Sequence, residues 1–369
     1  CTNRKNIYKL IHNNPNNKIL ILYPKKFKGQ LKYQFLNEIK KVLKKSEVSH
    51  NLNLLIYSLI SSRIDSVLSM FNVINQIFKN LKHIIVFPGN DTTLEGRLLV
   101  EMSKRKKIFT STIMHGSVTG EFLDTYHQVD RFFIFGNAIK NDLISKGVDS
   151  SKLFVSGSPY TNKIIDLQKN NFSLYSKLKN FKKDLPNILI AHSGPGNSTS
   201  FIHYQKFLKN LFRLIRTNKK FNWVIKLHRK DTIDNFKQAL DISDFSDYNI
   251  IDTNHFLYDK NIYDWFNHCN LLITGNSSTS VEAMLFSIPV ITADFDNEYD
   301  QVDFIDQNTT YHAKTYKEFS TFFQEIIIDK KLDLKIKKNA KEYSKNFYHI
   351  PETRPEEIIV KNLLDELEK

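Results

Sequence analysis

Cysteine, glycine and tryptophan are scarce in this chain of 369 residues, which contains 2 cysteines, 11 glycines and 2 tryptophans. Cys1 and Cys269 are too few for a disulfide framework or a thiolate metal cage, which fits a reducing cytoplasm. Zinc-finger spacing and RNP-like motifs are missing, so we expect no binding to nucleic acid. The sequence also lacks a Walker A motif, a dinucleotide-binding G-x-G-x-x-G after a strand, and G-x-S-x-G.

Long apolar runs are absent as well. No uninterrupted run of about 18 apolar residues and no cleavable signal pattern occurs, so we expect a cytoplasmic protein without a membrane-spanning segment. The chain begins at Cys1 rather than Met, which is compatible with an excised piece of a longer protein. Acidic residues are outnumbered 39 to 53 by Lys and Arg, giving a net charge of +14. This charge favours anionic partners, and we expect peripheral contact with an anionic inner-membrane surface.

Short apolar runs alternate with segments of helical periodicity, a pattern typical of parallel sheets with crossover helices. The first set of runs lies at 18–23, 52–57, 83–87, 108–114, 131–135 and 152–157. A second set lies at 187–194, 222–228, 248–253, 270–276 and 288–294. We therefore predict an α/β protein with two Rossmann-like domains, whose parallel sheets face each other across a cleft.

The segment 167–187 is polar, rich in lysine and closed by Pro186, and it is the predicted linker. We place the first domain at residues 1–166 and the second at 167–349. The final helix, within 350–369, is expected to pack back on the first domain.

In open parallel sheets, ligands bind beyond the carboxyl ends of the strands, so the residues after each run are the informative ones. The run that ends at Thr274 is followed by Gly275, Asn276, Ser277 and Ser278. Hydroxyls and a small turn residue at a helix N-terminus form an anion cradle, so we predict that this turn binds a phosphate. Plain N-capping would explain only one of the hydroxyls. Glu282, one turn later, is a candidate acceptor for ribose hydroxyls or simply a helix acid that the dipole favours.

Two further strand ends of the second domain carry suitable groups. Lys226, His228 and Arg229 would stabilise the charge that develops on a nucleotide phosphate leaving group. Alternation along the strand places Lys226 and His228 on one face. Ser193 and Gly194 follow the domain's first strand, where a glycine lets a backbone N–H approach a phosphate.

The first domain supplies the candidates for the reacting centre. His115 follows a strand directly and is a candidate base or phosphate partner. The carboxylates that accompany it as candidates are Glu121, Glu95 and Asp91. The alternative role for Asp91, together with Thr92, is to cap the helix that follows them.

Asp294 and Asp296 form a D-x-D pattern, which many metal-dependent sugar transferases use to hold a divalent ion. We interpret these residues instead as part of a polar loop lining the cleft, because cations and backbone groups already supply the phosphate site. No metal and no cofactor are expected.

Four motifs occur in the order found in GT-B glycosyltransferases of bacterial surface-polysaccharide assembly, which the chain resembles over residues 80 to 300. They are "MHG" ending at Gly116, "VSGSP" at 155–159, "KLHRKD" at 226–231 and "GNSSTSVEAMLFSIPVI" at 275–291. The sequence is similar in places to the teichoic-acid glycerophosphotransferases. It also looks like sialyltransferases and Kdo transferases that hold CMP with a histidine-proline and a serine pair, although Arg229 stands in place of that proline.

The resemblance implies a nucleotide-sugar donor in the second domain, a glycan or lipid-linked acceptor in the first, and metal-independent transfer between them. The donor sugar would be, for example, a CMP-activated ulosonic acid of a capsule or lipopolysaccharide. The alternatives are a CDP-polyol phosphotransferase, an enzyme similar to UDP-GlcNAc 2-epimerases, and a noncatalytic polyanion-binding module. The segments "GNDTTLEG" and "FVSGSPYTNKI" of this chain resemble loops of the epimerases.

Overall fold

The structure is a computed structural model. It describes residues 30–45, 49–80, 84–114, 128–159, 175–196, 199–228, 231–240, 248–251, 262–275, 277–297 and 303–368. The chain forms two compact units, of which the first comprises Cys1–Thr112 with Gln128–Asp130, and the second Ile113–His127 with Arg131–Lys369. The domain boundaries proposed from the sequence stay a prediction.

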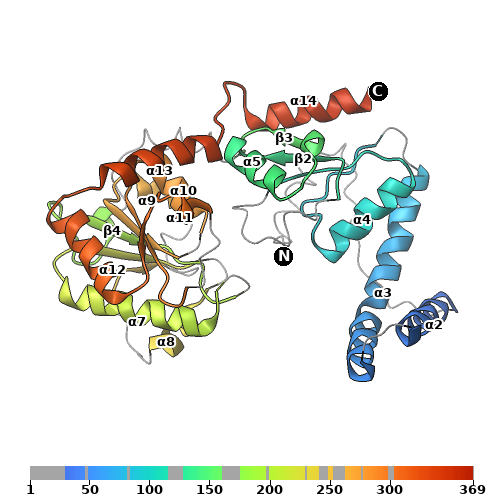
Figure 1. Ribbon diagram of the computed structural model, residues 1–369, viewed down its shortest axis with the longest axis horizontal. Helices are drawn as coiled ribbons and strands as arrows, with labels where there is room; N and C mark the ends of the chain where they lie inside the picture. The colour runs from blue at the N-terminus through green and yellow to red at the C-terminus, as the bar shows by residue number, and fades with distance from the viewer. Residues whose placement is uncertain are drawn as a thin grey trace. The chain divides into compact units, whose positions relative to one another are not determined.

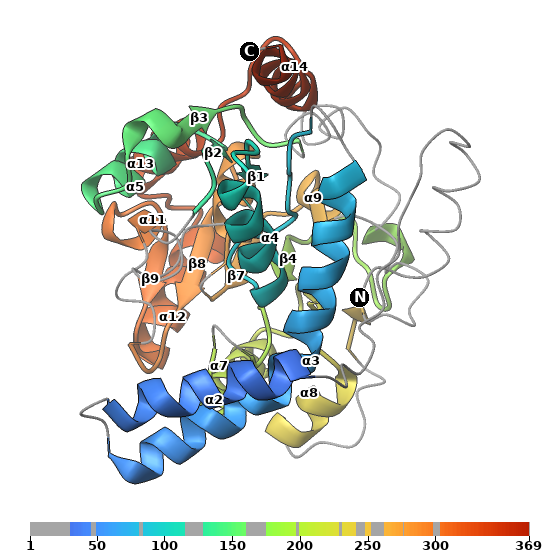
Figure 2. The same ribbon diagram turned by 90° about the vertical axis from the view of Figure 1, so that its right-hand side faces the viewer.

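The first unit is largely helical. Its helices include α2 (Gln30–Lys45), α3 (His50–Asn80) and α4 (Leu94–Arg105). Figure 2 shows α2 lying along the first half of α3, whereas the other end of α3 packs beside α4. The core of the unit contains Ile74, Phe78, Val86 and Met102, and Val86 forms a parallel bridge with Thr110.

The strand predicted at 52–57 is wrong, because these residues lie within α3. A short apolar run does not by itself distinguish a strand from a helix, and no glycine or proline interrupts residues 50–80. The segment His50–Lys79 is also long and apolar enough, by length and composition, to cross a membrane. The sequence-based expectation considered only uninterrupted apolar runs and so missed this segment, and the absence of a membrane-spanning segment stays a prediction.

The start of α4 also differs from the prediction. Thr93 is the N-cap, and its hydroxyl accepts a hydrogen bond from the Gly96 N–H at 3.1 Å, so Asp91 and Thr92 do not cap this helix. The preceding turn crosses α4 so closely that a Cβ on Gly96 would lie 1.8 Å from the Asn90 carbonyl oxygen. Glycine is therefore required there.

A three-stranded sheet has the order β1-β2-β3, formed by β1 (Ser111–Ile113), β2 (Arg131–Ile134) and β3 (Leu153–Val155). β2 and β3 pair in parallel, with Phe132 opposite Leu153. Between them lie α5 (Asn137–Ser145) and the short helix η2 (Ser150–Lys152). The predicted runs at 131–135 and 152–157 thus contain strands.

The larger sheet has six strands in the order β6-β5-β4-β7-β8-β9. They are β4 (Asn187–Ile190), β5 (Asn222–Lys226), β6 (Ile250–Ile251), β7 (Leu271–Thr274), β8 (Val290–Ala293) and β9 (Tyr311–Ala313). Every neighbouring pair is parallel. The apolar runs predicted from the sequence contain all of these strands except β9. Residues of β4 and β7 are buried throughout, as expected where helices cover both faces.

Alternate residues of β4 pack into two different layers. Ile188 and Ile190 contact the core beneath α7 (Phe201–Thr217) and α12 (Tyr316–Phe323), whereas Leu189 contacts the core beneath α9 (Ile262–Phe266) and α10 (Thr279–Leu285). Figure 1 shows α7 and α12 on one side of this sheet and α9, α10 and α13 on the other. The remaining helices of this region are α8 (Ile233–Leu240), α11 (Asp303–Asp306), α13 (Leu334–Phe347), η3 (Tyr175–Lys177) and η4 (Gln324–Ile328).

After α13 the chain returns to the smaller sheet. The His349 N–H donates to the Phe135 carbonyl at 2.9 Å, and the aromatic rings of Phe135 and Tyr348 stack. The last helix, α14 (Pro355–Leu367), then contacts β2, because the Arg131 guanidinium forms an ion pair with Glu366 at 3.0 Å. Figure 1 shows α14 beside β2 and β3.

Candidate functional site

The candidate site lies at the carboxyl edge of the larger sheet. Numbered along the chain, the strand order is 3-2-1-4-5-6, the order of Rossmann folds, and it reverses direction between β4 and β7. Ligands of such sheets bind at this reversal. β5, β4 and β7 are neighbours in the sheet, so the three sequence motifs that follow them meet at one edge.

The loop after β4 is held in a conformation that depends on glycine. Gly194 has a φ of +71°, and its N–H donates a hydrogen bond to His192 Nδ1 at 3.1 Å. Burial, together with the nearby His203 and His228, lowers the pKa of His192 to about 3. The imidazole is therefore neutral at physiological pH, and its ring proton lies on Nε2 because Nδ1 accepts a bond.

Ser193 lies between these two residues. Its Oγ atom is buried and has no hydrogen-bond partner among the described residues. Buried hydroxyls normally find a partner, and leaving one unbonded costs free energy. A ligand atom at the strand-order reversal would satisfy this hydroxyl.

Asp231 packs closely against Gly194 in the loop after β4. No role was predicted for it from the sequence. The Tyr204 hydroxyl donates a hydrogen bond to its carboxylate, whose other oxygen accepts from the Thr232 N–H at 2.8 Å and the Asn235 amide at 3.1 Å. Burial, and then the charge of Asp231, raises the pKa of Tyr204. The only sequence signal was its position at the end of the basic motif.

The end of β5 supplies the basic groups. Lys226, its last residue, is half-buried, and His228 is exposed two positions later. The His228 carbonyl accepts from the Asp231 N–H at 2.9 Å, which links this strand end to the loop after β4. Arg229 lies outside the described residues.

The two serines of the turn before α10, Ser277 and Ser278, differ in their hydrogen bonds. The Ser277 hydroxyl accepts from the Thr279 N–H at 3.3 Å and donates to the Thr279 hydroxyl at 3.0 Å. Ser278 is the N-cap residue, yet its side chain makes no capping bond. Gly275, at the end of β7, is buried, and Asn276 lies outside the described residues. Capping-type bonds thus account for Ser277 but leave the Ser278 hydroxyl unexplained.

Glu282 is half-buried on α10 and is approached by two phenols. The hydroxyls of Tyr263 and Tyr348 donate to its Oε1 atom at 3.1 Å and 3.4 Å. Burial raises the pKa of Glu282 to about 7, although the two tyrosine bonds act in the opposite direction. No sequence pattern around Glu282 indicates these two partners, of which Tyr348 lies 66 residues away.

The candidates for the reacting centre are only partly described. Asp91 is fully buried, and its carboxylate accepts a hydrogen bond from the Gln128 N–H at 3.1 Å, which fixes the segment before β2. Glu95 is exposed in the first turn of α4. His115 and Glu121 lie outside the described residues. Their roles in catalysis stay predictions.

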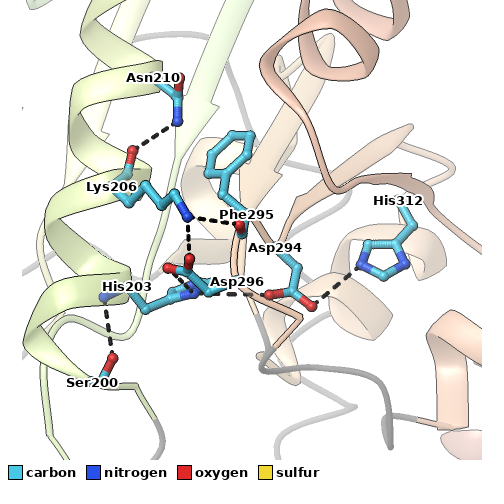
Figure 3. Close-up of polar contacts among 8 residues, drawn as sticks. All are labelled: Ser200, His203, Lys206, Asn210, Asp294, Phe295, Asp296 and His312. Carbon is cyan, nitrogen blue, oxygen red and sulfur yellow. Dashed lines mark hydrogen bonds and ion pairs between the residues drawn. The ribbon is translucent and has the colours of Figure 1, made fainter.

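Asp294 and Asp296 of the D-x-D pair form a polar cluster with His203, Lys206 and His312, in which Asp294 is buried and Asp296 is partly exposed (Figure 3). That this segment lines the cleft stays a prediction. Asp294 is fully buried, and its two oxygens lie 3.8 Å from His203 Nδ1 and 3.7 Å from His312 Nε2. Asp296 pairs with Lys206 and lies 3.5 Å from His203. No group of three potential ligands is arranged to hold a metal ion in the part of the chain that the structure describes. The Lys206 ammonium therefore already compensates Asp296, while Asp294 faces the imidazoles of His203 and His312.

No protein-family model and no curated protein sequence matches the chain. Its structure is similar to UDP-GlcNAc 2-epimerase from Methanocaldococcus jannaschii in complex with UDP-GlcNAc and UDP, with a TM-score of 0.55 and 16% identity over 82% of this chain and 81% of the other. For UDP-GlcNAc 2-epimerase from Neisseria meningitidis bound to UDP-GlcNAc, the TM-score is 0.54 and the identity 14%, over 82% of this chain and 81% of the other. For a glycosyltransferase from Rickettsia africae, the TM-score is 0.51 and the identity 17%, over 82% of each chain.

At these identities the likeness concerns the fold. The protein has an α/β fold of the GT-B type, with two Rossmann-like domains and parallel sheets, so the predicted fold class is confirmed.

Proposed function

We propose that the protein is an enzyme that acts on a nucleotide-activated sugar and binds the nucleotide phosphate at the carboxyl edge of the larger sheet. The observation that carries this proposal is the buried hydroxyl of Ser193, which has no hydrogen-bond partner among the described residues and lies beside Gly194 where the strand order reverses. The fold shared with structures that contain UDP-GlcNAc or UDP supports it.

The reaction we propose is glycosyl transfer to a surface glycan or a lipid-linked acceptor. Lys226 and His228 follow β5, which neighbours β4, and with Arg229 they would neutralise the phosphate that leaves with the nucleotide. Ser278, Gly275 and the Ser193 hydroxyl would position that phosphate. Glu282 would hold the ribose, its carboxylate already oriented by Tyr263 and Tyr348.

Epimerisation of a UDP-activated sugar is the second candidate. It is favoured by the shared fold, because several of the similar structures are UDP-GlcNAc 2-epimerases. The products distinguish the two reactions. A transferase releases free nucleotide only when an acceptor is present, whereas an epimerase changes the sugar while the nucleotide stays attached. Mass spectrometry and NMR of the products with CMP-, CDP- and UDP-activated donors would separate them.

Binding is tested first, by thermal shift with CMP, CDP, UDP and GDP, because a ligand of the folded state raises its apparent stability. Ser193→Ala should weaken nucleotide binding by about ten- to hundredfold, since a bond to a charged group contributes about 1.5–3 kcal/mol. The matched control is Ser111→Ala, which also removes a buried hydroxyl without a described partner, but in β1. Equal affinity of both variants and the wild type would contradict the site. Retention on heparin without any nucleotide shift would favour the polyanion-binding module instead.

A further inference from the structure

The hairpin of α2 and α3 exposes several large apolar side chains. Exposed fractions are 43% for Phe35, 66% for Val42, 46% for Leu52, 54% for Leu55 and 59% for Leu59. Single exposed apolar residues are ordinary, but a group of them on one face indicates a contact surface.

The spacing of the leucines places them together. Leu52, Leu55 and Leu59 follow the i, i+3, i+7 pattern and form one stripe along the first turns of α3. Phe35 and Val42 are seven residues apart and form a corresponding stripe on α2.

Both stripes lie on the same side of the hairpin. The Lys40 ammonium lies 4.9 Å from the centre of the Tyr57 ring, so these two side chains share one side. Residues two positions apart point in nearly opposite directions on a helix. Val42 therefore points away from the side of Lys40, and Leu55 and Leu59 point away from the side of Tyr57.

Specific contacts hold the two helices in this arrangement. The Lys32 ammonium pairs with Asp65 at 2.9 Å, and the Asn53 amide donates to the Leu43 carbonyl at 3.1 Å. α2 and α3 thus form one unit that presents the five side chains Phe35, Val42, Leu52, Leu55 and Leu59, termed the apolar face here.

Lysines flank the apolar face. α2 carries a single acidic residue, Glu38, and five basic ones: Lys32, Lys40, Lys41, Lys44 and Lys45. Lys41 and Lys45 are exposed and lie one and three residues from Val42, next to its side of α2, whereas Lys40 and Lys44 each lie two residues from Val42 and point away from it. Long lysine side chains extend their charge toward headgroups while their stems cover apolar surface. An apolar face with this charge is complementary to an anionic lipid surface.

The second half of α3 belongs to the protein core. Ile64, Leu68, Ile74 and Phe78 are buried, and this end of the helix packs beside α4 (Figure 1). By length and composition α3 could cross a membrane, but its second half is packed in the core of a folded unit. The exposed half is therefore suited to lie on a membrane rather than to cross it.

We propose that the apolar face of the α2–α3 hairpin docks on the surface of an anionic bilayer. The leucines enter the boundary between headgroups and acyl chains, and the lysines of α2 bind anionic headgroups. This inference concerns a surface of the first unit and is independent of the proposed nucleotide chemistry.

Flotation of the whole chain with vesicles tests this docking without any substrate. Wild-type protein should float with phosphatidylcholine vesicles that contain phosphatidylglycerol and stay at the bottom with pure phosphatidylcholine. The double variant Leu55→Asp, Leu59→Asp should lose about tenfold or more in vesicle affinity. Leu54→Asp is the matched control, because Leu54 is 56% exposed but lies on the side of Tyr57, and it should float like the wild type.

Two further measurements complete the test. Lys41→Glu, Lys45→Glu should reduce vesicle affinity by about fivefold or more per lysine. In a protein with Trp223 and Trp265 changed to Phe, a tryptophan introduced by Leu59→Trp should shift its emission to the blue with anionic vesicles, whereas one introduced by Leu54→Trp should not. The proposal is overturned if the double leucine variant floats like the wild type, or if analytical ultracentrifugation shows that the apolar face is covered in a dimer that the same variant dissociates.

Discussion

The side chain of Asp231 occupies the space that a Cβ atom on Gly194 would need. Such an atom would lie 2.9 Å from both Cβ and Cγ of Asp231. The loop that carries Ser193 is thus fixed by a close approach as well as by a positive φ. The buried Asp231 side chain thus determines the path of the loop on which the candidate phosphate site depends.

Gly194→Ala should therefore damage the site more than the strain of a positive φ alone. The left-handed conformation costs a non-glycine residue about 1–2 kcal/mol, and contact with Asp231 displaces the loop in addition. The control is Gly147→Ala, where φ is +87° but no atom lies within 4 Å of the added Cβ. Both variants should lose stability in urea titrations, while only Gly194→Ala should lose nucleotide binding by calorimetry. Equal nucleotide affinity in the two variants would count against the site.

Tyr204→Phe should destabilise the protein by about 1.5–3 kcal/mol, because the Asp231 carboxylate loses a hydrogen bond to a charged group in a buried place. Tyr175→Phe is a suitable comparison, since the buried Tyr175 hydroxyl donates to the neutral carbonyl of Trp265 at 2.9 Å. Its loss should cost only about 0.5–1.5 kcal/mol. Urea denaturation monitored by circular dichroism measures both values, and the reverse ranking would refute the assigned charge of Asp231.

Glu282 should make the stability depend on pH. The folded protein raises the pKa of Glu282 from 4.5 to about 7, so it binds the proton more tightly than the unfolded chain does. The free energy of unfolding should thus fall as the pH rises through this range, by about 1–2 kcal/mol after solvent screening.

Glu282→Gln should remove this contribution and flatten the profile between about pH 5 and pH 8. Glu318→Gln is the control, because backbone hydrogen bonds lower the pKa of Glu318 and its contribution changes only in acid. Thermal unfolding across the pH range measures the effect. A wild-type profile that is already flat would show that Glu282 keeps its ordinary pKa.

Asp294→Asn should destabilise the protein by about 2 kcal/mol more than Asp296→Asn, because Asp294 is fully buried between His203 and His312. Asp296 retains 26% side-chain exposure, and its partner Lys206 retains 50%, so solvent screens that pair. Chemical denaturation compares the two. A larger loss for Asp296→Asn would mean that the exposed pair stabilises the fold more than the buried one.

Local pattern was sufficient for most of the larger domain. The apolar runs at 187–194 and 270–276 contain β4 and β7. Such runs are informative because strands buried on both faces need continuous apolar sequence. The end of each apolar run also marks the carboxyl end of a strand. The polar residues that follow the strands could therefore be located from the sequence.

Pairs of residues that are distant in the chain were not predictable in this way. Nothing in the motif around Glu282 indicates Tyr348, and the D-x-D pattern gives no hint of His203 and His312. Likewise, the composition of residues 52–57 fits a strand as well as the helix α3 that forms. Tertiary packing decides these cases.

The sequence by itself determined an α/β protein with parallel sheets and the chemical groups at its strand ends, because hydrophobic periodicity and turn residues act locally. Only the tertiary structure decided that β4 and β7 are neighbours at the reversal of strand order, that the Ser193 hydroxyl finds no partner in the described part of the chain, and that Asp231 fixes Gly194. These relationships depend on which buried surfaces pack together, and that is a property of the whole chain.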